Sequence, residues 1–142
     1  MLQDTLIYHK SREVLHYNCE KPRAYYIPYH DAESALEDNR AYSKYFKNLC
    51  GDWDFAFYNT PRDLPDFTSE DFTEYFDKVT VPGSWQTYLG RGYDTPNYTN
   101  VNFPFPFDPP HVPDDNPCAL YKRSFEITAD QLENKDIFIN FE

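Results

Sequence analysis

The alternation of apolar and polar residues predicts two strands in the middle of the chain. Residues 52–58 carry an apolar face at period two, formed by Trp53, Phe55 and Phe57. Residues 76–81 form a second predicted strand, which ends at Pro82-Gly83, a dipeptide typical of turns. We therefore expect a half-buried sheet that begins near Leu49.

Two more strands are predicted towards the end of the sequence. They cover residues 121–127 and 136–142, with a turn or one helical turn expected over residues 128–135. Their inward-facing side chains are Tyr121, Phe125 and Ile127 in the first strand, and Ile137, Ile139 and Phe141 in the second. Arg123 is a misfit on the inward face. About four strands with an unfinished edge indicate a fragment of a larger polypeptide, or a chain that pairs with another.

The first part of the chain has a different character. Residues 1–45 are polar and irregular, and we expect them to form an arm that packs on something else. Within this arm, residues 31–39 are predicted to form a short helix with Asp31 as its N-cap. The domain proper is assigned to residues 46–142. Its aromatic residues predict an all-β fold, because Tyr, Phe and Trp favour strands and make up 19% of the 142 residues.

The charge balance excludes several kinds of partner. A formal net charge of −11 argues against nucleic acid and against anionic membrane surfaces, since both require clustered Lys and Arg. No apolar run approaches membrane-spanning length, and the first residues do not resemble a signal peptide. We interpret the acidic residues as keeping a soluble cytoplasmic protein apart from its neighbours.

Thiol, metal and phosphate chemistry have little support in the sequence. The cysteines Cys19, Cys50 and Cys118 show no CxxC spacing, so reduced thiols are expected rather than disulfides. A cysteine nucleophile would need a positioned base, and no local signature supplies one around His9, His16, His30 or His111. No metal-ligand spacing appears, and 4 glycines leave little room for a phosphate-binding loop.

Residues 93–117 are the candidate for ligand recognition. They hold seven of the 12 prolines together with several aromatic residues, which predicts a long, stiff, irregular loop that buries part of its surface. Such a loop suits sugar recognition. Its amides that could bind hydroxyl groups are Asn97, Asn100, Asn102 and Asn116. Asparagines in loops also commonly bond their own backbone, and from the residues alone both interpretations remain open.

Other candidate side chains have a structural explanation that we favour. Trp53 lies at strand spacing and is expected in the core, whereas Trp85, in a loop, could stack on a sugar or could pack structurally. Carboxylates such as Glu70-Asp71 and Asp114-Asp115 could act as general acids and bases, but we expect them in solvated turns.

Four segments of the chain resemble the N-terminal sugar-binding domain of family 2 glycoside hydrolases, in the β-galactosidase branch. They are Leu49-Cys50-Gly51-Asp52-Trp53-Asp54-Phe55, Val81-Pro82-Gly83-Ser84-Trp85-Gln86, Gly92-Tyr93-Asp94-Thr95-Pro96-Asn97-Tyr98-Thr99-Asn100-Val101, and the proline-rich run from Pro104 to Pro117. Their order and spacing match the family from about Leu49 to Glu142. The departure is Cys50, where the family usually has Asn.

The resemblance implies a galactose-binding-domain-like jelly-roll β-sandwich, incomplete at its C-terminus, with an irregular N-terminal arm. It implies a retaining hydrolase of β-galactosides such as lactose, whose two catalytic glutamates lie in a later barrel domain, so that no catalytic residue is assigned in this chain. Asn100 is implied to contact the substrate. The family also implies magnesium and sodium, with no metal ligand assigned here, and a homo-oligomer of the complete enzyme.

Two other functions remain open at this point. The chain could be a free-standing carbohydrate-binding module without catalysis. It could also be a structural fragment that complements a truncated enzyme in trans through residues 1–45. In either case, as in the favoured one, the chain alone is expected to be inactive.

Overall fold

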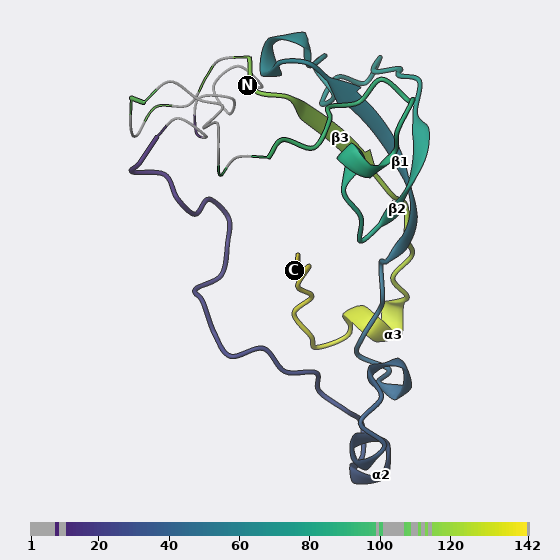
Figure 1. Cartoon of the computed structure of the whole chain (residues 1–142). Coiled ribbons are helices and arrows are strands. Elements are labelled where there is room, and N and C mark those ends of the chain that lie inside the picture. The colour runs from purple at the N-terminus through teal and green to yellow at the C-terminus, as the bar shows by residue number, and fades with distance from the viewer. Residues whose placement is uncertain are drawn as a thin grey trace. The chain divides into compact units, whose positions relative to one another are not determined.

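One antiparallel sheet organises the described part of the chain (Figure 1). The computed structural model describes Tyr8, residues 11–98, Asn100, residues 107–108, His111, Pro113 and residues 115–141. The three strands are β1 (Gly51–Tyr58), β2 (Asp77–Val81) and β3 (Cys118–Lys122), in the order β2-β1-β3. Around them lie short helices: α2 (Ala32–Leu36), α3 (Ala129–Leu132) and the 3₁₀ segments η2 (Arg40–Tyr42), η3 (Pro61–Asp63) and η4 (Trp85–Thr87). The predicted all-β class is confirmed.

Strand β1 lies in the centre of the sheet and pairs with a neighbouring strand along each edge. It pairs with β2 from Gly51 opposite Val81 to Phe55 opposite Asp77. It pairs with β3 from Asp54 opposite Lys122 to Tyr58 opposite Cys118. The most buried apolar side chains are Phe55 (1% exposed), Val79 (4%) and Ala56 (7%). The core is therefore small and centred on Phe55.

The first two predicted strands are confirmed, and the third is displaced. β3 begins at Cys118, because it pairs there with Tyr58 at the end of β1, and it ends at Lys122. The inward position predicted for Phe125 is wrong, since that side chain is 46% exposed. Arg123, whose charge did not fit the predicted inward face, forms a hydrogen bond instead: its guanidinium donates from Nη1 to the carbonyl of Leu49 at 2.8 Å.

The predicted strand over residues 136–142 is wrong for the residues that the structure describes. Residues 136–141 have no regular structure, and Ile137, Ile139 and Phe141 are 48%, 57% and 79% exposed. A strand is stable only when its backbone groups pair with a neighbour. The sheet pairs only β1, β2 and β3 among the described residues, so these alternating side chains lack the strand that would order them.

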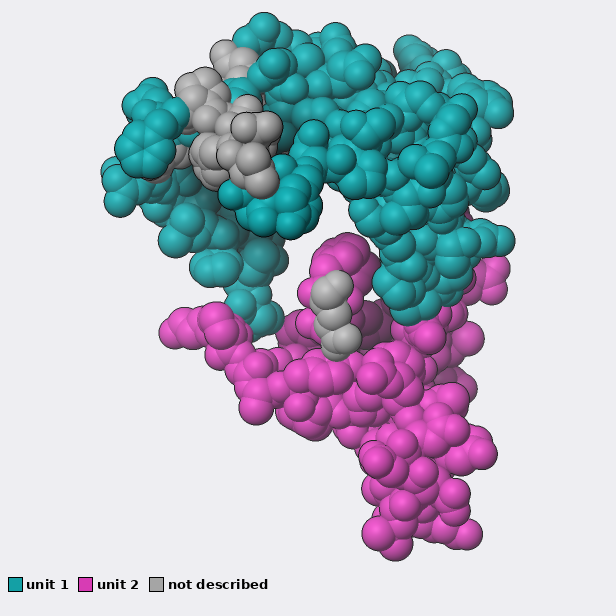
Figure 2. Space-filling view, in the orientation of Figure 1, with its two compact units in different colours: residues 1–20, 50–122 teal, residues 21–49, 123–142 magenta. Residues whose placement is uncertain are grey.

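The chain divides into two compact units, coloured differently in Figure 2. Unit 1 consists of Met1–Glu20 and Cys50–Lys122 and contains the sheet. Unit 2 consists of Lys21–Leu49 and Arg123–Glu142, so it combines residues from the expected arm with residues after β3. The predicted division into residues 1–45 and 46–142 stays a prediction.

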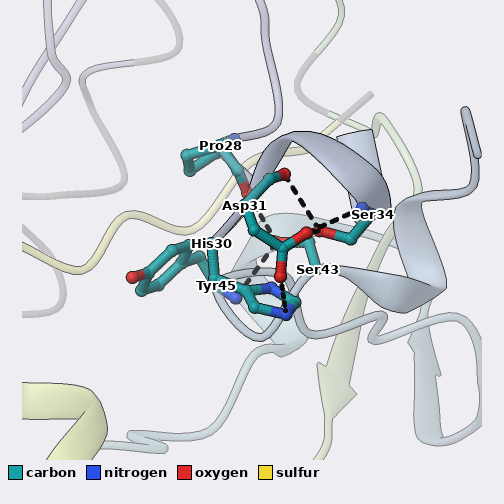
Figure 3. Close-up of polar contacts among 6 residues, drawn as sticks. All are labelled: Pro28, His30, Asp31, Ser34, Ser43 and Tyr45. Carbon is teal, nitrogen blue, oxygen red and sulfur yellow. Dashed lines mark hydrogen bonds and ion pairs between the residues drawn. The ribbon is translucent and has the colours of Figure 1, made fainter. Parts of the chain in front are cut away.

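Unit 2 contains the predicted short helix, which is confirmed as α2. Its N-cap is Asp31, whose Oδ1 accepts a hydrogen bond from the Ser34 amide at 2.7 Å (Figure 3). The other carboxylate oxygen lies 3.0 Å from His30 Nε2. The hydrogen bond from the Ser34 amide is the main reason why the pKa of Asp31 is lowered.

A buried hydroxyl group in the same unit joins two turns. Ser43 is 4% exposed, and its Oγ donates to the carbonyl of Pro28 at 2.6 Å while accepting from the amide of Tyr45 at 3.1 Å (Figure 3). Both capacities of the hydroxyl are thus used, as burial requires. The predicted helical turn over residues 128–135 is also confirmed: α3 has a capping box between Thr128 and Gln131. Among the described residues, no helix is long and apolar enough to cross a membrane.

Candidate functional site

The candidate site is the segment that follows β2, because it carries two of the motifs named above and packs on the sheet. Near the start of the segment lies Gly83, at a position where there is no room for a side chain. A Cβ on Gly83 would lie 2.5 Å from the carbonyl oxygen of Thr80, closer than a side chain can approach. The chain then enters η4 and runs on towards Asn100.

Side chains of this segment close the outer edge of β2. The hydroxyl of Tyr88 accepts a hydrogen bond from the Thr80 amide at 2.7 Å. Arg91 donates from Nη1 to the carbonyl of Lys78 at 2.9 Å, and its guanidinium lies 5.1 Å from the centre of the Tyr88 ring. Two backbone groups of β2 that face away from β1, the Thr80 amide and the Lys78 carbonyl, are in this way paired without a further strand. The segment is thereby fixed along the strand.

Aromatic rings fix the same segment to the face of the sheet. The ring of Phe55 lies 6.1 Å from that of Trp85 and 4.9 Å from that of Tyr93. Phe57 contacts the same two rings at 6.0 and 5.6 Å. These are ordinary aromatic separations for packed rings. Trp85 therefore packs on the core, in agreement with the structural interpretation that we favoured over sugar stacking.

The two tryptophans have different surroundings. Trp53 makes an edge contact with Tyr121 at 6.5 Å but is only half-buried, so it lies at the margin of the core in which it was predicted. The buried Nε1 of Trp85 has no hydrogen-bond partner among the described residues.

A polar anchor complements these rings. The phenol of Tyr93 donates to Oδ2 of Asp77, the first residue of β2, at 2.5 Å. Burial of the phenol, and then this hydrogen bond to a carboxylate, raise the pKa of Tyr93. On the same sheet the phenol of Tyr58 donates to Glu74 Oε2 at 2.6 Å, and burial likewise raises its pKa.

A shallow hollow opens on the outside of this segment. It has a volume of about 450 Å³ and is lined by Ser84, Gln86, Thr87, Asp94, Thr95, Pro96 and Asn97. Most of these side chains are polar. The Ser84 hydroxyl donates to Gln86 Oε1, and Oδ1 of Asp94 accepts from the amide of Thr95 at 2.9 Å. Among the lining residues, Asn97 was predicted individually as a possible ligand of hydroxyl groups, whereas Thr87 lies outside the motifs.

The four candidate asparagines have different positions. Asn97 lines the hollow, and Asn116 is exposed. Asn102 lies outside the described residues. Asn100 is exposed, and its side-chain amide donates from Nδ2 to the hydroxyl of Tyr98 at 2.9 Å. The structure thus describes Asn100 beside Tyr98, a residue of the same motif, and the contact of Asn100 with substrate stays a prediction.

The described carboxylates and thiols show no arrangement for catalysis. Glu70 and Asp71 are exposed, in agreement with the predicted solvated turn, whereas Asp114 lies outside the described residues. Cys19, Cys50 and Cys118 form no disulfide among the described residues. Burial, and then the negative charge of Asp63, raise the pKa of the Cys118 thiol, which disfavours the nucleophilic thiolate.

Metal ligands are likewise not gathered in the described ranges. No group of three or more His, Cys, Asp or Glu side chains there could hold a metal ion. The polar side chains of the candidate site are hydroxyl, amide and single carboxylate groups. This set suits hydrogen bonding to a hydroxyl-rich ligand better than it suits metal coordination.

Comparisons with known proteins identify the family. The model of the family described as "Glycosyl hydrolases family 2, sugar binding domain" matches residues 46–142. The chain is similar to a β-galactosidase of Actinobacillus pleuropneumoniae, 40% identical over 135 residues, which are 95% of this chain and 13% of that protein. A β-galactosidase of Staphylococcus xylosus is 35% identical over 137 residues, again 95% of this chain and 13% of the relative. The chain thus spans only a small part of these relatives, and by its match it belongs to the sugar-binding domain family of the family 2 glycosyl hydrolases.

Proposed function

We propose that the chain is the N-terminal portion of a β-galactosidase that hydrolyses terminal non-reducing β-D-galactosides such as lactose. The observation that carries this proposal is the 40% identity to a β-galactosidase over 95% of the chain. This similarity extends beyond the domain match at residues 46–142 into the preceding residues. The complete enzyme is proposed to be a cytoplasmic homo-oligomer.

In this proposal the chain forms one wall of the active site and binds the sugar through Asn100. An amide offers two donors and an acceptor, so it can bind a sugar hydroxyl without introducing charge. Support comes from the exposure of Asn100 and from the fixed segment that leads to it. That segment is held to β2 by the bonds of Tyr88 and Arg91 and to the core by Tyr93.

The chemical step is proposed to take place on residues outside this chain. A retaining glycosidase uses two carboxylates about 5 Å apart, one as nucleophile and one as acid and base. No carboxylate of this chain is given either role, so the chain contributes binding and positioning. The ligands of magnesium and sodium are also proposed to lie elsewhere in the enzyme, as the resemblance to the family implies.

A hybrid enzyme tests the proposal. Residues 1–142 replace the matching residues of the Actinobacillus pleuropneumoniae β-galactosidase, and hydrolysis of a nitrophenyl β-galactoside is measured. We expect an active hybrid, in which Asn100→Ala lowers kcat/KM by about 10- to 100-fold, the effect of losing one or two hydrogen bonds to substrate. The matched control is Asn116→Ala, another exposed asparagine, which should leave kcat/KM unchanged.

Three outcomes would contradict the proposal. A hybrid that assembles but does not hydrolyse the galactoside would argue against a place for this chain in the active site. An unchanged kcat/KM for Asn100→Ala would show that Asn100 does not contact the substrate. Binding of galactose by residues 1–142 alone, measured by calorimetry, would favour an independent carbohydrate-binding module.

A further inference from the structure

We propose that Tyr98 is a positioning residue that orients the side-chain amide of Asn100 for a pair of neighbouring sugar hydroxyls. The inference rests on the proposed function, since it adds a residue to the site assigned to Asn100. It is carried by one contact: Nδ2 of Asn100 donates to the hydroxyl of Tyr98 at 2.9 Å.

The contact restrains the side-chain amide of Asn100 with its nitrogen towards the phenol of Tyr98. A free carboxamide can rotate by half a turn and exchange its oxygen with its nitrogen, because the two ends have nearly the same shape. When Nδ2 donates to the phenol oxygen, the nitrogen end is fixed towards Tyr98. One N–H and the oxygen Oδ1 are then left for a ligand, as one donor and one acceptor.

This remaining pair matches a specific chemical group. Two hydroxyls on adjacent carbons of a sugar can donate one hydrogen bond to Oδ1 and accept another from Nδ2 in a single bidentate contact. A lone hydroxyl uses only one of the two groups at full strength. The expected ligand class is therefore a vicinal diol of a pyranose ring.

The role of Tyr98 can be tested separately from the packing of the core, because its side chain is exposed. It is 77% exposed, unlike Tyr93, which is half-buried against Phe55. The phenols of Tyr93 and Tyr58 donate to carboxylates, whereas the phenol of Tyr98 accepts from an amide. Removing the hydroxyl of Tyr98 should consequently leave the core intact and change only the freedom of Asn100.

A double-mutant cycle in the hybrid enzyme tests the inference. Tyr98→Phe should lower kcat/KM by about three- to tenfold, as expected for one neutral hydrogen bond, when Asn100 is present. The same substitution should have no effect in the Asn100→Ala background, because there is no amide left to orient. Tyr75→Phe, at an 80% exposed tyrosine, is the matched control and should be silent in both backgrounds.

Each result of the cycle has a distinct meaning. If Asn100→Ala is silent in an active hybrid, Asn100 does not contact the substrate, and the inference about Tyr98 is overturned with it. If Asn100→Ala is harmful and Tyr98→Phe is silent, the proposed function stands and the role of Tyr98 is overturned. If Tyr98→Phe is equally harmful in both backgrounds, the residue is only structural and the inference is also overturned.

A second measurement does not depend on turnover. In ¹⁵N-labelled residues 1–142, the Asn100 side-chain amide protons are observed by NMR with and without Tyr98→Phe. We expect two well-separated proton shifts that move together towards free-amide values in the variant, whereas Tyr75→Phe leaves them in place. Free-amide shifts in the unsubstituted chain would overturn the inference.

Discussion

The phenol of Tyr93 donates a hydrogen bond to Oδ2 of Asp77 at 2.5 Å, and so connects the segment after β2 back to the first residue of that strand. The ring that carries this phenol also packs on Phe55 at 4.9 Å. One side chain therefore contributes both a polar and an apolar contact. The two contributions can be separated, because phenylalanine keeps the ring and removes the hydroxyl.

Tyr93→Phe is expected to lower the free energy of unfolding by about 1 kcal/mol, because Asp77 loses a donor while the ring packing remains. Urea denaturation followed by tryptophan fluorescence measures the change. Tyr75→Phe is the control at an exposed tyrosine and should change stability by less than about 0.5 kcal/mol. Equal effects of the two substitutions would show that the bond to Asp77 does not stabilise the fold.

Stability is expected to fall at high pH. Burial raises the pKa of Tyr58, Tyr93 and Tyr121 above the ordinary value of 10.0, so the folded state favours the neutral phenols. Their contribution is complete below pH 10 and is lost as the pH rises through the raised values. The free energy of unfolding, measured between pH 9 and pH 11, should decrease less in Tyr93→Phe than in the unsubstituted chain. Parallel curves would contradict this.

Phe55→Ala should be the most harmful single truncation in the sheet. Phe55 is 1% exposed and contacts the rings of Trp85, Tyr93 and Tyr121, so its removal leaves a cavity at the centre of unit 1. A loss of about 3–5 kcal/mol is expected from denaturation curves. Leu89→Ala, at a side chain 80% exposed, is the matched control and should cost little.

Hydrogen exchange can test the closed edge of β2. In Tyr88→Phe the amide of Thr80 loses the acceptor that now lies 2.7 Å away. Its exchange rate should rise by about tenfold, corresponding to one hydrogen bond, while the amide of Val79, on the other side of the strand, changes little. Unchanged protection of Thr80 would mean that Tyr88 does not cap the edge in solution.

The N-cap of α2 provides a fifth test. Asp31→Ala should reduce the helical Cα chemical shifts of residues 32–36, because the Ser34 amide loses its acceptor. Asp31→Asn keeps a good capping group and should preserve them. As the pKa of Asp31 is lowered, the charged cap is present above pH 3.8 and is lost as the pH falls through the lowered value. Identical shifts in both variants would contradict the role of the cap.

The sequence predicted those strands in which apolar and polar side chains alternate and the backbone also pairs with a neighbouring strand. β1 lies where Trp53, Phe55 and Phe57 recur at period two, and β2 lies directly before the predicted turn at Pro82-Gly83. The two strands complete each other's hydrogen bonds. Residues 136–141 show the same alternation and form no strand, because periodicity reports the side chains and says nothing of a partner for the backbone.

The displacement of the third strand has a different cause. Its limits follow from register: Cys118 is opposite Tyr58, and Lys122 is opposite Asp54. Such cross-strand positions are not encoded in the local pattern of residues 121–127. The same holds for the candidate site, where the motifs indicated Asn100 but the phenol of Tyr98 beside it became visible only in three dimensions.

The side-chain closure of β2 has a consequence for the behaviour of the isolated chain in concentrated solution. An exposed strand edge is a template on which other polypeptides can assemble into aggregates. At the outer edge of β2, an incoming chain would first have to displace the phenol of Tyr88 and the guanidinium of Arg91. Two side chains from one loop thus protect this edge against intermolecular assembly. In many β-proteins an additional strand covers such an edge instead.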